Sequence, residues 1–293
     1  MKIVPGTSSK HLADKISHLL GEQIIPIEFK RFPDGEMYIR FTKEVKGEDV
    51  VIVQSTGPPQ DENLIQLLLL IDTARDLGAR SIIAVVPYVA YGRQMQRHRP
   101  GEAVSATTVF KLLKNAGVDY FITVDYHSPE TINTIGNSVQ NISAIPSLAH
   151  FMVQNNLEDA FSLAPDKGAI KFAETAARIM KGGYSWLEKN RDIITGEVTF
   201  ELRDLDVKNK DAVVFDDIIS TGSTMVHAIK ALKKQGARRV YAACVHPLLI
   251  NNAKERISQA GAIQIVGTDS VPSSVSVVSI APVITEALKR WLK

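Results

Sequence analysis

Short apolar runs alternate with longer amphipathic stretches along most of the chain. Residues 50–53 form an apolar run, and an amphipathic pattern then continues to residue 77. A second apolar run follows at residues 81–86. Apolar strands that alternate with amphipathic helices predict βαβ units. We therefore expect an α/β protein built on mostly parallel sheets, with helices flanking each sheet.

The same order of elements occurs twice. The second copy is a strand at residues 212–218, a helix, and a strand at residues 239–245. In both copies a glycine follows the last helical turn, within Gly78-Ala79-Arg80 and Gly236-Ala237-Arg238, as at a left-handed helix cap. We expect two tandem, duplicated Rossmann-like domains, with the change between them near residues 143–146.

Composition is that of an ordinary globular protein. The 293 residues suffice for two domains, 45% of them are hydrophobic, and 23% are charged. A formal charge of +2 gives no reason to expect nucleic-acid binding. The single cysteine, Cys244, lies in an apolar run, so we expect a buried thiol and a reducing, cytoplasmic location. Residues 5–9 interrupt any signal-peptide core, and the apolar stretch at 64–71 is too short to span a membrane.

The segment from residue 213 to 225 is the most informative in the chain. An apolar strand ends in Asp216 and Asp217, and the turn Ser220-Thr221-Gly222-Ser223-Thr224 leads into a helix. Backbone N–H groups and hydroxyls of such a turn can surround a phosphate, with the helix N-terminus behind them. The two carboxylates would repel a phosphate and suit sugar hydroxyls instead. We expect a pentose 5-phosphate here, and the alternative is an ordinary connection with an acidic N-cap.

Two segments of the first half predict a nucleotide site. In Phe32-Pro33-Asp34-Gly35-Glu36, before a strand at residues 37–41, an aromatic ring and two acids can stack a purine and accept from its amino group. A β-turn with solvated acids is the alternative. Arg93, Arg97 and Arg99 follow a strand end and suit a polyanion such as a triphosphate. A solvated basic loop or a nucleic-acid patch is the alternative there.

Two further strand ends carry candidate metal ligands. Asp125 and His127 follow the apolar strand at residues 120–124. Such a pair can hold Mg²⁺ directly or through water, although histidine is an uncommon Mg²⁺ ligand and is more often structural. Asp166 lies in a glycine-containing turn before a predicted helix at residues 170–180. It suits either a metal ion or a simple helix cap.

Residues 184–191 and 198–202 predict the two strands of a hairpin that carries Lys189 and Arg191. The polar loop between them, residues 192–197, is expected to be a mobile lid. Charges on the surface of an ordinary hairpin are the alternative.

Taken in order, these segments resemble the ribose-phosphate pyrophosphokinase family over essentially the whole chain. That family lies in the phosphoribosyltransferase superfamily, which shares the sugar-phosphate loop. The resemblance implies an ATP-binding domain of residues 1–143 with 280–293, whose terminal helix has Leu288 and Trp291 on its apolar side. It implies a ribose-5-phosphate-binding domain of residues 144–279 with a β-hairpin catalytic flap. The expected reaction is Mg²⁺-dependent transfer of the pyrophosphoryl group of ATP to the C1 hydroxyl of ribose 5-phosphate, which releases AMP.

The resemblance also implies a role for each candidate residue. ATP would contact Phe32, Asp34, Gly35, Glu36, Arg93, Gln94 and Arg99. Mg²⁺ would be held at His127 and Asp166, with Asp125 nearby. Ribose 5-phosphate would contact Arg191, Asp216, Asp217, Ser220, Thr221, Gly222, Ser223 and Thr224. Lys189 and Arg191 would stabilise the transition state.

Two segments depart from the common bacterial members of that family, namely Met95-Gln96 and residues 129–133. Those regions serve subunit contact and nucleotide regulation in the bacterial enzymes. We expect a homo-oligomer, a dimer or larger, and these departures favour an archaeal-like dimer or tetramer over the bacterial hexamer and its inhibition by ADP.

Two rival functions share parts of this pattern. A phosphoribosyltransferase would have the sugar-phosphate loop without needing Phe32 to Glu36 or Lys189, and a non-catalytic homologue would have lost loop or flap residues. A P-loop enzyme is excluded at this turn, because Gly222-Ser223-Thr224-Met225 lacks the Gly-Lys-Ser/Thr that such a loop requires.

Overall fold

The chain divides into two compact units. The computed structural model describes residues 1–97, 99–127, 138–191, 198–201 and 205–291. Unit 1 comprises residues 1–143, 270–272 and 279–293, and unit 2 comprises residues 144–269 and 273–278. The expected division into an ATP-binding and a sugar-phosphate-binding domain concerns ligands and stays a prediction.

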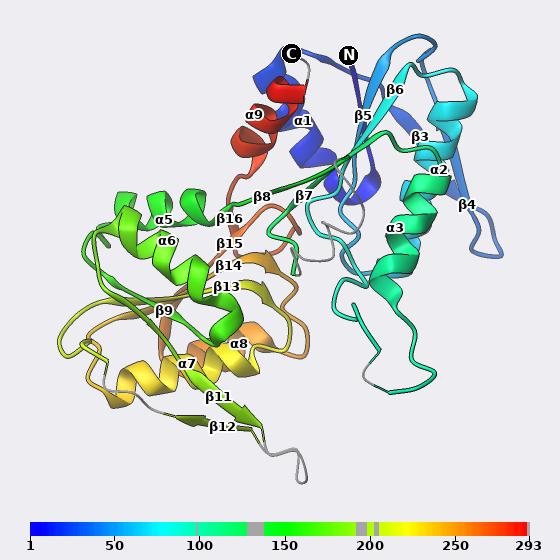
Figure 1. The fold of residues 1–293 in the computed structure, drawn as a ribbon. Helices are drawn as coiled ribbons and strands as arrows, with labels where there is room; N and C mark the ends of the chain where they lie inside the picture. Colours follow the sequence, from blue (N-terminus) through cyan, green and yellow to red (C-terminus); the bar gives the residue numbers. More distant parts are fainter. Residues whose placement is uncertain (98, 128–137, 192–197, 202–204, 292–293) are drawn as a thin grey trace. The chain divides into compact units, whose positions relative to one another are not determined.

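Unit 1 contains a six-stranded sheet in the order β2-β1-β5-β6-β7-β8, with every adjacent pair parallel (Figure 1). Its strands are β1 Lys2–Pro5, β2 Gln23–Ile24, β5 Asp49–Val53, β6 Ser81–Val85, β7 Tyr120–Val124 and β8 Val139–Ile142. Its described helices are η1 Thr7–Ser9, α1 Lys10–Leu20, α2 Gln60–Asp76, α3 Ser105–Asn115 and α9 Ala281–Trp291. Helices α1 and α9 contact each other on one face, and α2 contacts α3 on the other.

Unit 2 repeats this arrangement strand for strand, in the order β10-β9-β13-β14-β15-β16 (Figure 1). Its strands are β9 Phe161–Ala164, β10 Tyr184–Trp186, β13 Ala212–Ile219, β14 Val240–Pro247, β15 Ala262–Thr268 and β16 Ser276–Val278. Its described helices are α5 Ile145–Gln154, η2 Lys167–Ala169, α6 Ile170–Met180, α7 Ser223–Lys234 and α8 Ala253–Gln259. Helices α5 and α6 cover one face, and α7 and α8 cover the other. The predicted fold of two duplicated α/β domains is confirmed.

Helices on both faces explain why the sheet strands are apolar throughout. Parallel strands covered on two sides expose neither face to water. Val50 to Val53 in β5 and Ala212 to Phe215 in β13 are accordingly 0% exposed. Cys244 in β14 is also buried, as expected. Within the described ranges, no helix is long and apolar enough to cross a membrane.

Each unit also carries a two-stranded antiparallel ribbon directly after its edge strand. In unit 1 the ribbon is β3 Ile27–Arg31 with β4 Met37–Phe41, and in unit 2 it is β11 Glu188–Arg191 with β12 Val198–Glu201. The turn that contains Phe32 is therefore the tip of a hairpin, and this hairpin is the topological counterpart of the predicted flap. Residues 192–197 and Leu202, like residues 129–133, lie outside the described residues.

The predicted flap strand over residues 184–191 is wrong in its first part. Residues 184–186 form β10, which pairs in parallel with β9, so that Tyr184 lies opposite Ser162. Leu187 is fully buried and its N–H still donates to the Ala164 carbonyl at 3.0 Å. The chain thus leaves the main sheet only after Leu187, and the hairpin begins at Glu188.

The C-terminal helix α9 packs within unit 1 through the side that its sequence pattern indicates. Leu288 is 0% exposed. The ring of Trp291 lies 5.5 Å from the ring of Tyr120 on β7. The predicted apolar side of this helix is confirmed.

The duplication extends to the turns that enter the second strand of each copy. Gly78 and Gly236 have φ of +81° and +84°, which confirms the predicted left-handed caps. The Gly78 carbonyl accepts from the Gly47 N–H at 2.8 Å, and the Gly236 carbonyl accepts from the Asn209 N–H at 2.9 Å. The same backbone link therefore closes both copies.

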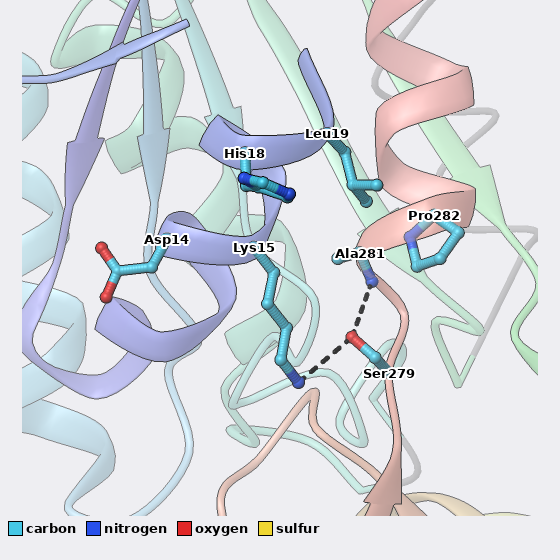
Figure 2. A pocket seen from close by; sticks show the side chains of 7 residues that line it. All are labelled: Asp14, Lys15, His18, Leu19, Ser279, Ala281 and Pro282. Carbon is cyan, nitrogen blue, oxygen red and sulfur yellow. Dashed lines mark hydrogen bonds between the residues drawn. The ribbon is translucent and has the colours of Figure 1, made fainter. Parts of the chain in front are cut away.

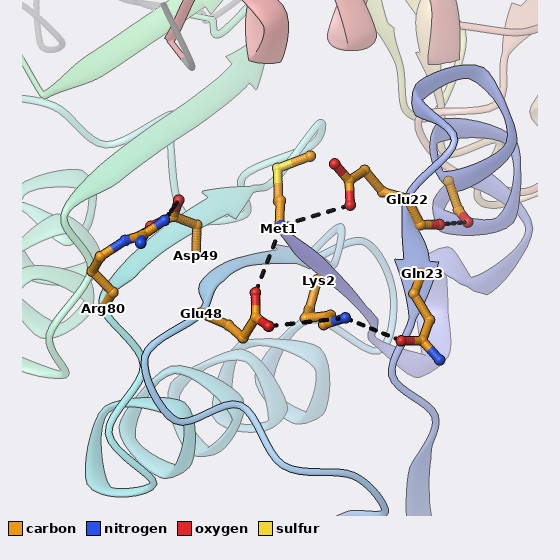
Figure 3. A network of polar contacts seen from close by, with 8 residues as sticks. Met1, Lys2, Glu22, Gln23, Glu48, Asp49 and Arg80 are labelled. Carbon is orange, nitrogen blue, oxygen red and sulfur yellow. Dashed lines mark hydrogen bonds and ion pairs between the residues drawn. The ribbon is translucent and has the colours of Figure 1, made fainter.

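An Asp–Arg ion pair recurs at the amino ends of these strands. In unit 1, Arg80 pairs with Asp49 (Figure 3). In unit 2, Asp211 accepts four hydrogen bonds of 2.6–3.0 Å from Arg238 and Arg239. The carboxyl of Asp211 is 8% exposed, and hydrogen bonds from Arg239 and then Arg238 hold its pKa well below the ordinary value.

Asp211→Asn should lower the free energy of unfolding at neutral pH by about 1–3 kcal/mol, because charge-assisted hydrogen bonds to two guanidinium groups are lost. The pKa of Asp211 is lowered in the folded protein, so its stabilisation is complete above the unfolded-state pKa of about 4. It is lost as the pH falls through the lower folded pKa. Urea unfolding of both proteins as a function of pH measures this, and the gap between them should close only in acid.

Lys210→Ala is the matched control, since Lys210 pairs with Asp206 on the surface of the same turn. Its effect should stay below about 1 kcal/mol, as for other exposed pairs. A difference between Asp211→Asn and the native protein that did not change with pH would contradict the ionic origin of the stabilisation.

Candidate functional site

The paired acids lie near the carboxyl end of β13 in unit 2. Asp216 is half-buried and Asp217 is 8% exposed. One carboxylate oxygen of Asp216 accepts from the Asp217 N–H at 3.0 Å, and one of Asp217 accepts from the Ile218 N–H at 2.8 Å. Each side chain is thus held by the backbone of the next residue. The acids follow the buried run of the strand at its carboxyl edge, where α/β proteins bind ligands.

A third acid, Asp166, follows the neighbouring strand β9. One of its carboxylate oxygens accepts from the Gly168 N–H at 2.9 Å, which confirms the helix-cap interpretation for η2. The pKa of Asp216 is raised well above its ordinary value, first by burial and then by repulsion from Asp217 and Asp166. A hydroxyl donor or a cation from a ligand would relieve this repulsion.

The turn after the acids brings hydroxyls and a helix N-terminus together. Gly222 has φ of +75° and is the N-cap of α7, without a side-chain hydrogen bond to the cap. The hydroxyls of Thr221 and Ser223 lie 3.3 Å apart. The first turn of α7 contains no acid, and its last turn contains two lysines. The expected alternative, an acidic N-cap, is therefore wrong, and the helix end suits an anion.

Helix α8 packs directly against this turn. A Cβ added to Gly222 would lie 3.0 Å from the Ile257 Cδ1 atom and 3.3 Å from the Ala253 Cβ atom. Arg256, on the same helix, donates to the Thr221 carbonyl and to the Ser223 hydroxyl. Arg256 was not among the predicted residues, because no local motif links a helix at residue 253 to a turn at residue 221.

The corresponding place in unit 1 is filled by the protein itself. Gln54, directly after β5, holds the position that corresponds to Asp216 in the second copy. The side chain of Gln54 is 0% exposed. Its side-chain oxygen accepts from the N–H of Ser8 at 3.2 Å and from the Ser8 hydroxyl at 2.9 Å. The Thr56 hydroxyl accepts from the Ala90 N–H at 2.7 Å. Internal contacts therefore take up the polar groups that a ligand would need in the first copy.

The predicted adenine-binding residues form the tip of the β3–β4 hairpin. The N–H of Phe32 donates to the Glu36 carbonyl and the N–H of Gly35 to the Phe32 carbonyl, both at 2.9 Å. The Asp34 carboxylate accepts from the Glu36 N–H at 3.1 Å. The ring of Phe32 is 42% exposed and meets the ring of Tyr38 edge-on. The tip therefore presents an aromatic face and two exposed acids to solvent.

The predicted phosphate-binding arginines lie in the loop between β6 and α3. Arg93, Arg97 and Arg99 are exposed, and their loop is organised by Glu102. A carboxylate oxygen of Glu102 accepts from the Gln94 side chain at 3.2 Å and from the Arg99 N–H at 3.1 Å. In the part of unit 1 that the structure describes, this loop and the hairpin tip share no hydrogen bond or ion pair. Among the described residues, the structure thus does not join the two sets of predicted ATP residues by a polar contact.

The first pair of metal candidates follows β7 in unit 1. Asp125 is 5% exposed, has φ of +37°, and its N–H donates to the Ile142 carbonyl at 2.8 Å. A positive φ is uncommon outside glycine, although aspartate adopts it more readily than most residues. His127, two residues on, is exposed. Within the described ranges, no three Asp, Glu, His or Cys side chains form a group that could hold a metal ion.

The predicted catalytic cations both lie on the flap strand β11. Lys189 pairs with Phe200, and Arg191 pairs with Val198, across the antiparallel ribbon. The hairpin itself is thus confirmed from Glu188 onward, while the roles of the two cations stay predictions.

A hollow elsewhere in unit 1 contains none of the predicted ligand residues. It has a volume of about 470 Å³ and lies between α1 and the start of α9 (Figure 2). Lys15 and His18 contribute from α1, and Ser279 and Pro282 contribute from the other side. The Lys15 ammonium donates to the Ser279 hydroxyl at 3.4 Å, so this contact ties α1 to the segment before α9.

Comparison with known proteins decides the family. Residues 1–117 match the N-terminal domain of ribose phosphate pyrophosphokinase, and residues 130–279 match the phosphoribosyl transferase domain. The chain belongs to the ribose-phosphate pyrophosphokinase family. It is 44% identical over 287 residues to a ribose-phosphate pyrophosphokinase of Methanothermobacter thermautotrophicus, covering 98% of this chain and 99% of the relative. It is 40% identical over 291 residues to that of Sulfolobus acidocaldarius, covering 99% of each.

The fold agrees with this membership of the ribose-phosphate pyrophosphokinase family. The crystal structure of phosphoribosylpyrophosphate synthetase from Mycobacterium smegmatis matches with a TM-score of 0.87 and 28% identity, covering 99% of this chain and 98% of that one. A simple phosphoribosyltransferase is ruled out, because the N-terminal half matches a domain of the pyrophosphokinases in addition to the phosphoribosyl transferase domain matched by the C-terminal half. The chain is therefore a metal-dependent transferase of nucleotide biosynthesis.

Gly222→Ala should destabilise the protein more than Gly21→Ala does. Both glycines have similar positive φ, +75° and +69°, so both substitutions introduce backbone strain of about 1–2 kcal/mol. Nothing lies within 4 Å of a Cβ on Gly21, whereas a Cβ on Gly222 meets Ile257 at 3.0 Å. Overpacking should add about 1–3 kcal/mol at Gly222 only. Denaturant unfolding of both variants checks this. Equal losses in the free energy of unfolding would show that α8 shifts to accommodate the added methyl group without cost.

Proposed function

We propose that the chain transfers the β,γ-pyrophosphoryl group of ATP to the C1 hydroxyl of ribose 5-phosphate, giving phosphoribosyl pyrophosphate and AMP. The observation that supports this best is the edge of β13. There Asp216 and Asp217 lie in the last four residues of β13, which is followed by a turn that ends at the uncapped N-terminus of α7. The names of the relatives, which are ribose-phosphate pyrophosphokinases, point to the same reaction.

Unit 2 is proposed to bind ribose 5-phosphate. The turn from Ser220 to Thr224 would hold the 5-phosphate by its N–H groups and hydroxyls, with Gly222 allowing close approach of the backbone. Asp216 and Asp217 would accept from the sugar hydroxyls. The raised pKa of Asp216 supports this, because a carboxyl crowded by other acids gains from a ligand that brings hydroxyl donors.

Unit 1 is proposed to bind ATP. The exposed ring of Phe32 offers a stacking face, with Asp34, Gly35 and Glu36 beside it. The exposed guanidinium groups of Arg93 and Arg99, together with the Gln94 amide, would contact the phosphates. The loop around Gln54 and Ser8 supports this division, since internal hydrogen bonds occupy its polar groups at the strand end where unit 2 has its turn.

Mg²⁺ is proposed as the metal. Asp166 supports this in unit 2, because carboxylate oxygens are the ligands that Mg²⁺ prefers and its cap hydrogen bond uses only one of its two oxygens. His127 and Asp125 are proposed as ligands in unit 1. When bound, Mg²⁺ would neutralise phosphate charge and orient the phosphate oxygens.

The protein's part in the reaction is then mostly positioning. Holding the acceptor hydroxyl in line with the β-phosphorus turns a bimolecular step into an effectively unimolecular one. Lys189 and Arg191, on β11, are proposed to donate to the reacting phosphate oxygens and to neutralise the charge that develops on the departing AMP. Arg191 is proposed to contact ribose 5-phosphate as well.

Assembly and location are proposed on sequence grounds only. We propose a homo-oligomer, a dimer or tetramer, because Met95-Gln96 departs from the bacterial pattern. A cytoplasmic location rests on the single, buried Cys244.

The purified chain should release AMP and form phosphoribosyl pyrophosphate only when ATP, ribose 5-phosphate and Mg²⁺ are all present. Chromatographic quantification of both products checks this, and a chelator should stop it. Lys189→Ala is the control for contaminating activity: it should slow turnover by about 10²–10³, the usual effect of losing one transition-state donor. Absence of AMP under all conditions, or AMP at the same rate without ribose 5-phosphate, would refute the proposed function.

Substitutions in the two units should affect different substrates. Phe32→Ala should raise the KM for ATP roughly tenfold, since stacking on a base contributes about 1–3 kcal/mol, and should leave the KM for ribose 5-phosphate unchanged. Ser223→Val should do the reverse, because it replaces a loop hydroxyl by a bulkier apolar group. Initial rates with each substrate varied in turn provide the measurement.

Ile65→Ala is the matched control for the loss of an exposed apolar side chain in unit 1, since Ile65 is 48% exposed on α2. It should change neither KM. If Phe32→Ala impaired only the use of ribose 5-phosphate, the assignment of the two substrates to the two units would be wrong even though the overall reaction stood.

A further inference from the structure

The side chain of Arg256 on α8 spans two groups of the turn that precedes α7. One terminal nitrogen donates to the Thr221 carbonyl at 3.1 Å, and the other donates to the Ser223 hydroxyl at 3.3 Å. The residue lies 35 positions after Thr221 in the sequence. It is therefore the fold of unit 2, and not a local motif, that places this guanidinium at the turn.

The contact with Thr221 controls the direction of a whole peptide group. A trans peptide is planar, and its carbonyl and N–H point in opposite directions. Holding the Thr221 carbonyl on Arg256 therefore directs the Gly222 N–H away from Arg256. A turn that binds a phosphate needs its N–H groups toward the anion and its carbonyls away from it. Without Arg256, this carbonyl would lose the side-chain hydrogen bond that fixes its direction.

The charge of Arg256 is also available at the turn. A guanidinium is always protonated and has five N–H donors, of which the two hydrogen bonds to the turn use two. Arg256 makes no ion pair with Asp or Glu in the described part of unit 2. Lys254, two residues before it, donates instead to the Ser274 hydroxyl at 3.1 Å. Arg256 is thus the cation of α8 that faces the turn.

We propose that Arg256 is a positioning residue for the 5-phosphate of the sugar substrate. It fixes the Thr221–Gly222 peptide, orients the Ser223 hydroxyl, and adds positive charge beside the anion. This inference rests on the proposed binding of ribose 5-phosphate in unit 2 and assigns a role to a helix outside the Asp216–Thr224 segment.

Arg256→Ala should raise the KM for ribose 5-phosphate and its calorimetric dissociation constant roughly tenfold, as expected for the loss of a charge-assisted hydrogen bond. The KM for ATP and kcat should stay within a factor of about two, because the effect is on ground-state binding. Arg256→Lys should recover only part of the affinity, since an ammonium keeps the charge and lacks the planar fork that spans both groups. Lys254→Ala removes one positive charge from the same helix and should change neither constant.

The outcomes separate this inference from the function on which it rests. If the native chain forms no phosphoribosyl pyrophosphate, the proposed function fails and so does this inference. If the native chain is active and Arg256→Ala keeps native affinity for ribose 5-phosphate, only the role of Arg256 is refuted. An equal loss of affinity in Lys254→Ala, or an equal rise in the KM for ATP, would also refute it. Arg256→Gln, which keeps two donors without the charge, replaces the alanine variant if that protein melts below the assay temperature.

Discussion

The parallel pairing of β13 between β9 and β14 determines the candidate sugar-phosphate site. Val214 pairs with Leu163, and Asp216 pairs with Cys244, so the acids lie beyond the last residue of β13 that pairs with β9 and near the carboxyl end of the strand. A strand buried on two faces tolerates charge only at its ends, because an unpaired buried carboxylate is very unfavourable. The same register places Asp166, after β9, close enough to raise the pKa of Asp216. Strand pairing thus determines both the position of the site and the repulsion among its carboxylates.

The two copies agree at the amino ends of their strands and differ at the carboxyl ends. At the amino ends, an Asp–Arg ion pair and a glycine cap recur in both units; the pairs are Asp49 with Arg80 and Asp211 with Arg238. At the carboxyl ends, the second copy has an acid where the first has Gln54, whose amide is bound to Ser8. The amino-end contacts stabilise the fold in both copies. At the carboxyl ends, internal hydrogen bonds close the loop of the first copy, whereas the second copy has a turn that leads to the N-terminus of α7.

Features that depend on neighbouring residues were predicted well from the sequence, and contacts between distant residues were not. The residues from Asp216 to Thr224 are contiguous, so their order alone indicated a strand, a turn and a helix. The boundary at Leu187 was missed because Tyr184 to Arg191 reads as one extended run, whereas its first residues pair with β9. Arg256 was missed because its partners lie more than 30 residues away. The loss of the acids in the first copy was visible in the sequence, yet the closure of that loop by Gln54 depends on contacts 46 residues apart.

The charge distribution along the turn gives the site a direction. Carboxylates lie at one end, and at the other end lie the N-terminus of α7 and the guanidinium of Arg256. A ligand that is anionic at both ends would be repelled by the acids, and one that has only hydroxyls would leave the helix end without an anion. A molecule with a phosphate at one end and hydroxyls at the other matches both. On the proposed function, this polarity allows one orientation of ribose 5-phosphate, with the hydroxyl-bearing end of the sugar directed toward the acids.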